Sequence, residues 1–519
     1  MASRKVYDII FTFSMRKDIV QFMDIKKAKE YIKDTVKLYL KKDEFGEYRI
    51  PVVRQRPIFL LGAPGVGKTA IMEQVASELG IALVSYSMTH HTRQSALGLP
   101  YIVKKEYNGE QFDISEYTMS EIIASIYEVM DASGVSEGIL FLDEINCVSE
   151  TLAPAMLQFL QYKIFGKHKV PEGWVIVTAG NPPEYNKSVR EFDVVTYDRL
   201  KVMEVEADYS VWKEYAHDRR LSGAIINYLD INKDDFYVID TTVRGRGYVT
   251  ARGWEDLSQI ILLYEEEHLE VDETLVGQYL KNDRIVREFT AYYDLYRRYV
   301  SDYCVDDILK GTIDAAAVDK AGRASYDEKL SLVGIFSDRI LGKTKDITEK
   351  SDFIQELFKL LTAIKNGDKE IPVMLQLMIE ARHKNIDSKT KAGAYNDMEK
   401  RKDKNIVSFL TNANKQVNGI TDRDDAFDII KQSFGDKKQD LMDDVQNTTK
   451  SLDSVLEFMQ VAFGEGNELV LFLTELTVDK STSIFLANFG NKKYSELSKK
   501  LMLDDPSDKI MQMIDRLDL

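Results

Sequence analysis

The chain has 519 residues, of which 44% are hydrophobic and 30% are charged, and this composition is typical of globular proteins rather than disordered or fibrous ones. The 85 acidic residues outnumber the 69 basic ones, so the net charge of −16 argues against a general nucleic-acid binder. Two cysteines cannot form a disulfide framework, and no Cys/His cluster has the spacing of a zinc site. The sequence shows neither a secretory signal pattern nor an apolar run of about 18 residues, so we expect a cytoplasmic protein without a transmembrane helix.

Helical and apolar segments alternate in the first part of the chain. Residues 16–42 are rich in Lys, Ile and Leu and lack Gly and Pro, which favours a helix, and residues 68–79 favour another that stops at Gly80. Continuous apolar runs bounded by turn residues are typical of strands that are covered on both faces. Such runs occupy residues 57–61, 81–85, 138–142, 174–178 and 201–205. We therefore predict an α/β fold with a mainly parallel, five-stranded sheet.

The second part of the chain is predicted to be helical. Eight of the ten prolines lie at or before Pro183, so helix breakers are rare beyond it. Helical patterns cover residues 211–229, 250–268, 274–300, 325–341, 350–366 and 373–384, and further helices follow to the end. We expect turns at residues 418–421, 434–437 and 464–466.

The strongest motif is GAPGVGKT, which follows an apolar run, opens a helix and fits the pattern G-x-x-x-x-G-K-[ST]. Glycines let backbone N–H groups turn inward around phosphate oxygens, and the helix N-terminus adds positive partial charge. Lys68 would reach the β- and γ-phosphates, and the Thr69 hydroxyl would bind Mg²⁺. The alternative is a Gly-rich turn without a ligand. The residues predicted to bind a nucleotide are Gly62, Ala63, Pro64, Gly65, Val66, Gly67, Lys68 and Thr69.

An acidic pair ends the third apolar run. In ILFLDEIN, a strand would deliver Asp143 and Glu144 to its C-terminal edge, where ligands bind in open α/β sheets. Asp143 could hold Mg²⁺, and Glu144 could orient and polarise an attacking water. The alternative is a strand that merely leads into an acidic turn. Because the phosphate-binding motif lies in the same predicted sheet, we favour the metal and water roles.

Three further polar residues are candidates for the same site. Asn181 follows the fourth apolar run, where it could hydrogen-bond the attacking water or the γ-phosphate, or form an Asn-Pro turn. Arg199 lies in YDRL before the fifth run, and Arg252 lies in TARGWEDLS at the start of a helix that Thr250 is expected to cap. An arginine can offset charge that develops on a transferred phosphoryl group, although most arginines are surface residues.

In order and spacing, these features resemble the AAA+ ATPases, and the similarity is closest to the MoxR branch. The stretches that carry the resemblance are RPIFLLGAPGVGKT, FLDEIN, TAGNPPEYN, TYDRL and TARGWEDLS. The resemblance implies that residues 62–69 are Walker A, that Asp143 and Glu144 are Walker B, and that Asn181 is sensor 1. ATP and Mg²⁺ are the implied cofactors.

The same resemblance implies roles for the arginines. Arg252 would be sensor 2, which contacts the nucleotide of its own subunit from a helical lid. Arg199 would be the arginine finger that completes the site of the neighbouring subunit, with Arg190 as the alternative. The expected parts of the chain are an N-terminal helical segment at 1–50, an α/β nucleotide-binding domain at 51–207, a helical lid at 208–300 and a helical C-terminal domain at 301–519.

Two insertions look like those of MoxR proteins. Leu99–Met119 would be a hairpin in the helix-2 insert, and Lys163–Gly173 a second hairpin before sensor 1. The basic tip residues Lys163, Lys167, His168 and Lys169 would contact a client, or the hairpin is simply solvated. The family usually forms a hexameric ring, works with proteins that carry a von Willebrand A-type domain, and matures another protein in a chaperone-like way.

Three functions are therefore open. The first is a ring-forming motor that hydrolyses ATP and remodels a protein client. The second is a scaffold that assembles on ATP with little turnover, against which Glu144 and Arg199 argue. The third is a nucleic-acid-dependent motor, which the acidic charge disfavours.

Overall fold

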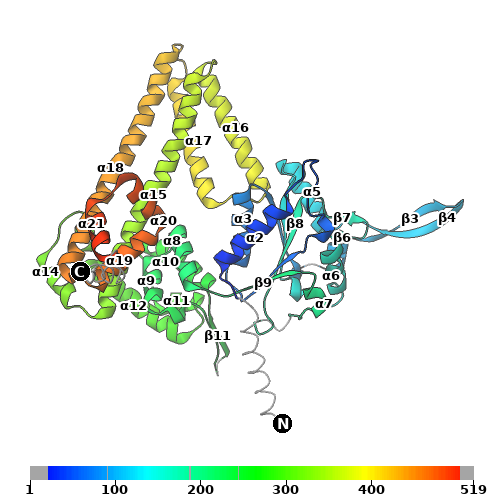
Figure 1. Cartoon of the computed structure of the whole chain (residues 1–519), viewed down its shortest axis with the longest axis horizontal. Coiled ribbons are helices and arrows are strands. Elements are labelled where there is room, and N and C mark those ends of the chain that lie inside the picture. The colour runs from blue at the N-terminus through cyan, green and yellow to red at the C-terminus, as the bar shows by residue number, and fades with distance from the viewer. Residues whose placement is uncertain (1–21, 91, 186–188, 243–244, 503–519) are drawn as a thin grey trace, which may run out of the picture. The chain divides into compact units, whose positions relative to one another are not determined.

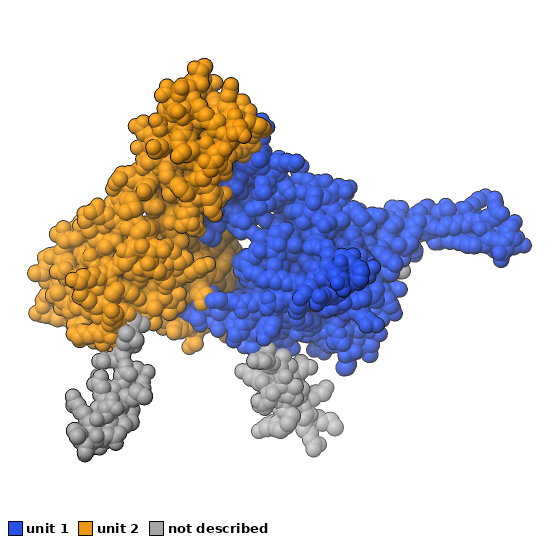
Figure 2. Space-filling view, turned by 45° about the horizontal axis from the view of Figure 1, so that its top comes forward, with its two compact units in different colours: residues 1–211, 380–403 blue, residues 212–379, 404–519 orange. Residues whose placement is uncertain are grey.

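The computed structural model of the chain describes residues 22–90, 92–185, 189–242 and 245–502 (Figure 1). The chain forms two compact units, coloured separately in Figure 2. Unit 1 contains the residues up to Val211 together with Glu380–Asp403, and unit 2 contains Trp212–Ile379 and the residues from Lys404 onward. The division into four domains at 1–50, 51–207, 208–300 and 301–519, which we expect from the sequence, stays a prediction.

Unit 1 is built around a parallel sheet of five strands, as predicted, and its order is β2-β5-β8-β1-β9. The strands are β1 (Ile58–Gly62), β2 (Ala82–Ser87), β5 (Gly138–Asp143), β8 (Trp174–Gly180) and β9 (Lys201–Val205). Each lies within two residues of a predicted apolar run. In the centre, Leu60 of β1 pairs with Ala179 of β8 on one side and with Met203 of β9 on the other.

The apolar runs form strands because both faces of the sheet are buried. Ile139, Leu140, Phe141 and Leu142 of β5 have no exposed surface, and Phe59 of β1 is equally buried. The ring of Phe59 lies 5.3 Å from that of Phe192 and 6.4 Å from that of Tyr197. The described helices that lie wholly in unit 1 are α2 (Ile25–Tyr39), α3 (Lys68–Leu79), α4 (Arg93–Leu97), α5 (Glu121–Ser133), α6 (Ala153–Tyr162) and α7 (Val194–Tyr197).

The first described helix, α2, is shorter than the predicted helix at 16–42. It begins after Asp24, whose carboxylate accepts a hydrogen bond from the Lys27 N–H at 2.8 Å, and it ends at Tyr39. Residues 16–21 of the predicted helix lie outside the described residues. By contrast, α3 has the predicted bounds, and Gly80 ends it with a left-handed φ of 66°.

Both predicted hairpins are present in unit 1. The longer one pairs β3 (Pro100–Tyr107) with β4 (Glu110–Tyr117) and projects from the body of the unit (Figure 1). Its turn is Asn108–Gly109, where both residues have positive φ, as a tight two-residue hairpin turn requires. The shorter hairpin pairs β6 (Ile164–Phe165) with β7 (His168–Lys169).

The described residues of unit 2 form helices and one antiparallel ribbon, which pairs β10 (Val238–Thr242) with β11 (Gly245–Val249). The helices after β9 are α8 (Tyr209–Arg219), α9 (Gly223–Ile231), α10 (Ala251–Glu266), α11 (Glu273–Tyr279), α12 (Asp283–Asp302), α13 (Val305–Leu309), α14 (Ala315–Arg323), α15 (Tyr326–Asn366), α16 (Ile371–Lys391), α17 (Asp397–Val417), α18 (Arg423–Phe463), α19 (Asn467–Val478), α20 (Lys480–Phe489) and α21 (Lys492–Met502). None of the described helices is long and apolar enough to cross a membrane.

Several helix boundaries in unit 2 differ from the predicted ones. The helix expected at 211–229 is broken near Arg220, which has a φ of 57°, and the helix expected at 274–300 is broken before Asn282, which caps α12. Conversely, the helices expected at 325–341 and 350–366 are one 41-residue helix, and the turn expected at 434–437 lies inside α18. The expected turns at 418–421 and 464–466 are confirmed by the ends of α17 and α18.

Tertiary packing explains why α15 continues where its sequence suggested a stop. In the joining stretch, Thr344 is fully buried and its hydroxyl lies 2.8 Å from that of Thr482, while Ile347 packs in a core cluster with Phe485. Packing of this kind overrides weak local propensity.

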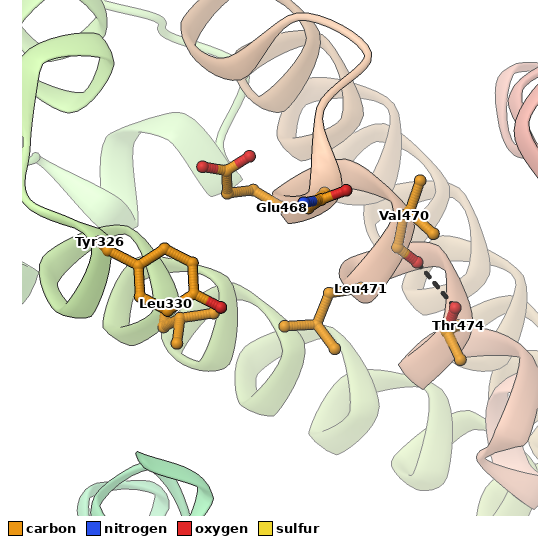
Figure 3. Close-up of a pocket in the computed structure, with 7 residues that line it drawn as sticks. Tyr326, Leu330, Glu468, Val470, Leu471 and Thr474 are labelled. Atoms are coloured by element: carbon orange, nitrogen blue, oxygen red, sulfur yellow. Dashed lines mark hydrogen bonds between the residues drawn. The ribbon is translucent and has the colours of Figure 1, made fainter.

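At its start, α15 also borders a groove in unit 2, where Tyr326 and Leu330 face Leu471 of α19 (Figure 3).

We predict that Phe59→Ala destabilises unit 1 by about 3–5 kcal/mol, because it removes a fully buried ring that packs against two others. Phe112→Ala is the matched control, since Phe112 lies on the projecting hairpin with 46% of its surface exposed. That variant is expected to change stability by no more than about 0.5 kcal/mol. Urea unfolding followed by circular dichroism measures both, and equal losses would contradict the assignment of Phe59 to the core.

Candidate functional site

The sheet order brings three chain segments to one edge of unit 1. Parallel strands place their carboxyl ends together, and ligands of open α/β sheets bind outside those ends. Because β8 lies between β1 and β5, the segment after β8 is flanked by the segments after β1 and β5. These three segments carry the GAPGVGKT loop, Asn181 and the acidic pair Asp143 and Glu144.

The loop between β1 and α3 is built around glycines. Gly65 and Gly67 have φ values of 80° and 94°, which L side chains rarely adopt. Gly67 is the N-cap of α3 and provides no side-chain hydrogen bond, so no side chain caps the N–H groups of the first turn. A helix end of this kind favours an anion such as a phosphate group.

Lys68 is the buried cation of the site, with 8% of its surface exposed. Its ammonium group donates hydrogen bonds to the Gly62 carbonyl at 2.7 Å, the Ala63 carbonyl at 2.9 Å and Asn181 Oδ1 at 2.9 Å. The last of these bonds joins two residues that are 113 positions apart in the sequence. The structure therefore brings Lys68 and Asn181 together, as the two sequence motifs require if they serve one site.

The next residue, Thr69, reaches the acidic pair. Its hydroxyl donates to Asp143 Oδ2 at 2.9 Å, and Asp143 Oδ1 accepts the Glu144 N–H at 2.9 Å. A hydroxyl beside one carboxylate fits Mg²⁺, which usually takes one or two protein ligands and completes its shell with waters and phosphate oxygens. Within the described residues, no group of three or more His, Cys, Asp and Glu side chains could hold a metal ion on its own.

The Glu144 carboxylate is held by two hydroxyls that the sequence analysis missed. Its backbone is left-handed, with a φ of 56°, and its carboxylate accepts hydrogen bonds from Ser87 at 3.2 Å and Thr89 at 3.1 Å. Ser87 ends β2, the neighbour of β5, and its hydroxyl lies 3.0 Å from that of Thr89. Neither residue belongs to a sequence motif, and only knowledge of the strand order would have identified them.

Asn146 is a third residue near the site that the sequence analysis missed. Only 4% of its surface is exposed, and its side-chain amide donates to the Asn181 carbonyl at 2.8 Å. Gly180 makes room for this contact, because a Cβ at that position would lie 2.5 Å from the Asn146 side-chain oxygen. Asn146 therefore fixes the turn that presents Asn181 to Lys68.

The three candidate arginines have different surroundings. Arg190 forms an ion pair with Glu150, and its backbone N–H donates to the Asn146 carbonyl at 2.9 Å. Arg199 is exposed between α7 and β9. Arg252 is exposed in the first turn of α10 in unit 2, and the predicted cap is confirmed, because Thr250 accepts a hydrogen bond from the Gly253 N–H at 3.3 Å.

The basic hairpin at 163–173 differs from the expectation in one respect. Lys163 is not an exposed tip residue: 3% of its surface is exposed, and its ammonium group donates to the Val52 carbonyl at 2.5 Å. Burial lowers the pKa of Lys163 to about 8. Lys167 forms an ion pair with Glu116 of the longer hairpin, and Lys169 is exposed.

We predict that the stability of the protein rises with pH through the action of Lys163. Between about pH 8 and 10.5 the unfolded lysine keeps its proton while the folded one releases it, so higher pH favours the folded state. The full effect is about 3 kcal/mol. Lys163→Met removes this dependence, so the stability of the variant relative to the wild type should fall as the pH rises from 7 to 10.

Urea unfolding at these pH values measures the difference, and Lys169→Met is the matched control because Lys169 is an exposed lysine of the same hairpin. The control should keep a constant offset from the wild type. A constant offset for Lys163→Met as well would show that Lys163 is not buried.

A comparison with known families agrees with this geometry. Residues 57–200 match the family model of the AAA domain (dynein-related subfamily). A search of curated proteins found no match to the chain. The matched region runs from the start of β1 to the residue before β9 and contains the loop at 62–69, the acidic pair and Asn181. The match supports an AAA+ ATPase, and an AAA domain implies nucleotide-dependent ATPase activity.

Proposed function

We propose that the protein is a MoxR-like AAA+ ATPase that hydrolyses Mg²⁺-ATP and works as a ring-forming, chaperone-like motor on a protein client. One observation carries the proposal of ATP hydrolysis. Lys68 bonds to Asn181 and Thr69 bonds to Asp143, so three separate sequence motifs meet at one edge of the sheet in unit 1. The resemblance to the MoxR branch is the basis for the ring and the client.

In this proposal, the loop at 62–69 binds the phosphates. The N–H groups at the start of α3 and the Lys68 ammonium group would donate hydrogen bonds to the phosphate oxygens. Lys68 would keep its hydrogen bond to Asn181 at the same time. Thr69 and Asp143 would hold Mg²⁺. Bound Mg²⁺ supplies positive charge that offsets the negative charge on the phosphoryl oxygens.

Glu144 would orient and polarise the attacking water. Its carboxylate must face that water, whereas it now accepts hydrogen bonds from the hydroxyls of Ser87 and Thr89. These hydroxyls would therefore compete with the water for the Glu144 carboxylate. Their strength would set the fraction of time in which Glu144 can accept a hydrogen bond from the water. Asn181 would position the water or the γ-phosphate from the end of the neighbouring strand, β8.

The charge that develops during phosphoryl transfer needs a further cation, which we assign to arginines. Arg199 is the better candidate for a finger that acts on the neighbouring subunit, because it is exposed while Arg190 is already paired with Glu150. Arg252 would act from the helical lid on the nucleotide of its own subunit. A homo-oligomer, with the hexamer of the family as the first candidate, follows from a finger that acts between subunits.

The hairpins are the candidate surfaces for the client. Lys167 of the shorter hairpin pairs with Glu116 of the longer one, and Lys105 pairs with the same carboxylate at 2.5 Å. These bonds hold the pKa of Glu116 at about 2, so the link between the hairpins stays charged at neutral pH. We propose that the joined hairpins contact a protein, with a von Willebrand A-type domain protein as the candidate partner.

We predict that Glu144→Gln binds ATP as the wild type does but hydrolyses it at least 100-fold more slowly, because the amide cannot polarise the water. Glu128→Gln is the control, since Glu128 is an exposed carboxylate on α5. Phosphate release and binding of a fluorescent ATP analogue measure the two quantities. If the wild type is as inactive as Glu144→Gln while ATP still drives assembly, the ATP-gated scaffold is the correct function. Stimulation by DNA would favour a nucleic-acid motor.

We predict that Arg199→Ala lowers ATP turnover by about 10³-fold and that mixing with Glu144→Gln subunits restores part of the activity. In mixed rings, the intact Glu144 of one subunit meets the intact Arg199 of its neighbour. Arg252→Ala is the matched control, because a residue that acts within its own subunit cannot be rescued in this way. Phosphate release from mixtures at several ratios measures the rescue, and equal behaviour of the two arginine variants would contradict the assignment.

A further inference from the structure

A segment from the helical part of the chain belongs to unit 1. Residues 380–403, here called the returning segment, comprise the end of α16, a short turn and the start of α17. The segment is separated from the sheet strands by more than 170 positions, since β9 ends at Val205. Its sequence carries no feature that the AAA domain match or the site described above uses.

The returning segment covers the free edge of the sheet. In the described sheet, β2 is an edge strand that pairs with β5 on one side. On its other side, the Leu83 N–H donates to the Ala392 carbonyl at 2.7 Å. Gly393 follows with a φ of 66°, and a Cβ there would lie 2.7 Å from the Leu83 carbonyl oxygen. The backbone at Gly393 lies so close to the backbone of β2 that a side chain would not fit, so position 393 requires glycine.

Side chains tie the returning segment to two helices beside β2. The Ser388 hydroxyl donates to the Ser133 carbonyl at the end of α5 at 2.6 Å. The Asn396 side-chain amide donates to the Ser77 hydroxyl in the last turn of α3 at 2.7 Å. The segment is stiffened by its own ion pair, in which Arg382 lies 3.2 Å from Asp403.

The elements that the segment holds lead directly to the nucleotide site. Helix α3 is held near its C-terminus, and its N-terminus carries Lys68 and Thr69. Strand β2 is held near its start, and its last residue is Ser87, which bonds to Glu144. A rigid helix or strand that shifts at one end also shifts at the other. Helix α3 and strand β2 therefore connect the docking contacts of the returning segment to the candidate nucleotide site.

We propose that docking of the returning segment on β2 and α3 is energetically coupled to nucleotide binding, so that the segment acts as a positioning device for Lys68 and Glu144. The inference rests on the proposed nucleotide site. Coupling of this kind is reciprocal. If nucleotide changes the docking equilibrium by some factor, the docked and undocked forms must differ in nucleotide affinity by the same factor. A variant that weakens docking therefore shifts the observed affinity toward that of the undocked form. The helices α16 and α17 continue from the segment into unit 2, so their displacement acts on the same contacts.

The first test is hydrogen exchange on the wild-type full chain, with and without Mg²⁺ and ATPγS. The Leu83 amide reports docking directly, because it donates to Ala392. Its exchange rate is expected to differ at least threefold between the two conditions, while the peptide that covers residues 62–69 becomes protected. Protection at 62–69 with unchanged exchange at Leu83 overturns the inference alone. Absence of protection at 62–69 overturns the proposed function and the inference with it.

The second test uses Gly393→Ala, whose methyl group would push against the Leu83 carbonyl. The matched control is Gly419→Ala, since Gly419 follows α17 with a φ of 89° and a Cβ there meets no atom within 4 Å. Gly393→Ala is expected to speed Leu83 exchange at least threefold and to change the Kd for ATPγS at least threefold, while the control leaves both within about 1.5-fold.

Reciprocity fixes the sign of the change in Kd. If nucleotide speeds Leu83 exchange in the wild type, Gly393→Ala must bind ATPγS more tightly, and if nucleotide slows it, the variant must bind more weakly. The opposite sign or an unchanged Kd overturns the inference. Ser388→Ala gives the same readout with less disturbance of folding, and Thr390→Ala is its control, because the Thr390 hydroxyl bonds to Ile386 within the same helix.

Discussion

The position of β8 between β1 and β5 is the constraint on which the candidate site depends. With this order, the buried Lys68 ammonium group meets the Asn181 side chain, and Thr69 meets Asp143. Lys68 also donates hydrogen bonds to the carbonyl oxygens of Gly62 and Ala63, in the loop before α3. A largely buried ammonium group beside the N-terminus of α3 would favour an anionic ligand. In the proposed function, this arrangement would receive a phosphate group.

Local patterns predicted the sheet and the glycine-rich turn between β1 and α3 well, because both are specified by neighbouring residues. A continuous apolar run such as ILFL can be buried only if both faces of the strand are covered, and glycines beside a lysine predict a turn around phosphate. The same reasoning failed for Ser87, Thr89 and Asn146. These residues reach Glu144 and Asn181 only through the strand order, which no local pattern in the chain specifies.

Long-range packing also explains the other differences. Lys163 lies in a basic stretch that resembles a solvated hairpin tip, yet its side chain is buried against Val52, a residue 111 positions away. The docking of residues 380–403 on β2 is still more remote, and Gly393 is its one local sign, which in isolation predicts only a turn. Local sequence patterns place residues on helices and strands. Contacts between distant helices and strands depend instead on the burial of apolar surface and on the hydrogen bonding of buried polar groups.

The surroundings of the candidate residues separate two tasks. Lys68, Asp143, Glu144 and Asn181 are held by bonds within unit 1, so the groups that would bind the nucleotide and its metal are organised in advance. Arg199 is instead exposed, and Arg190 is neutralised by Glu150. A phosphoryl-transfer site that lacks its arginine hydrolyses slowly, and delivery of that arginine can raise the rate by about 10³–10⁵-fold. If Arg199 comes from a neighbouring subunit, a single chain can bind the nucleotide, but fast hydrolysis requires the assembled ring.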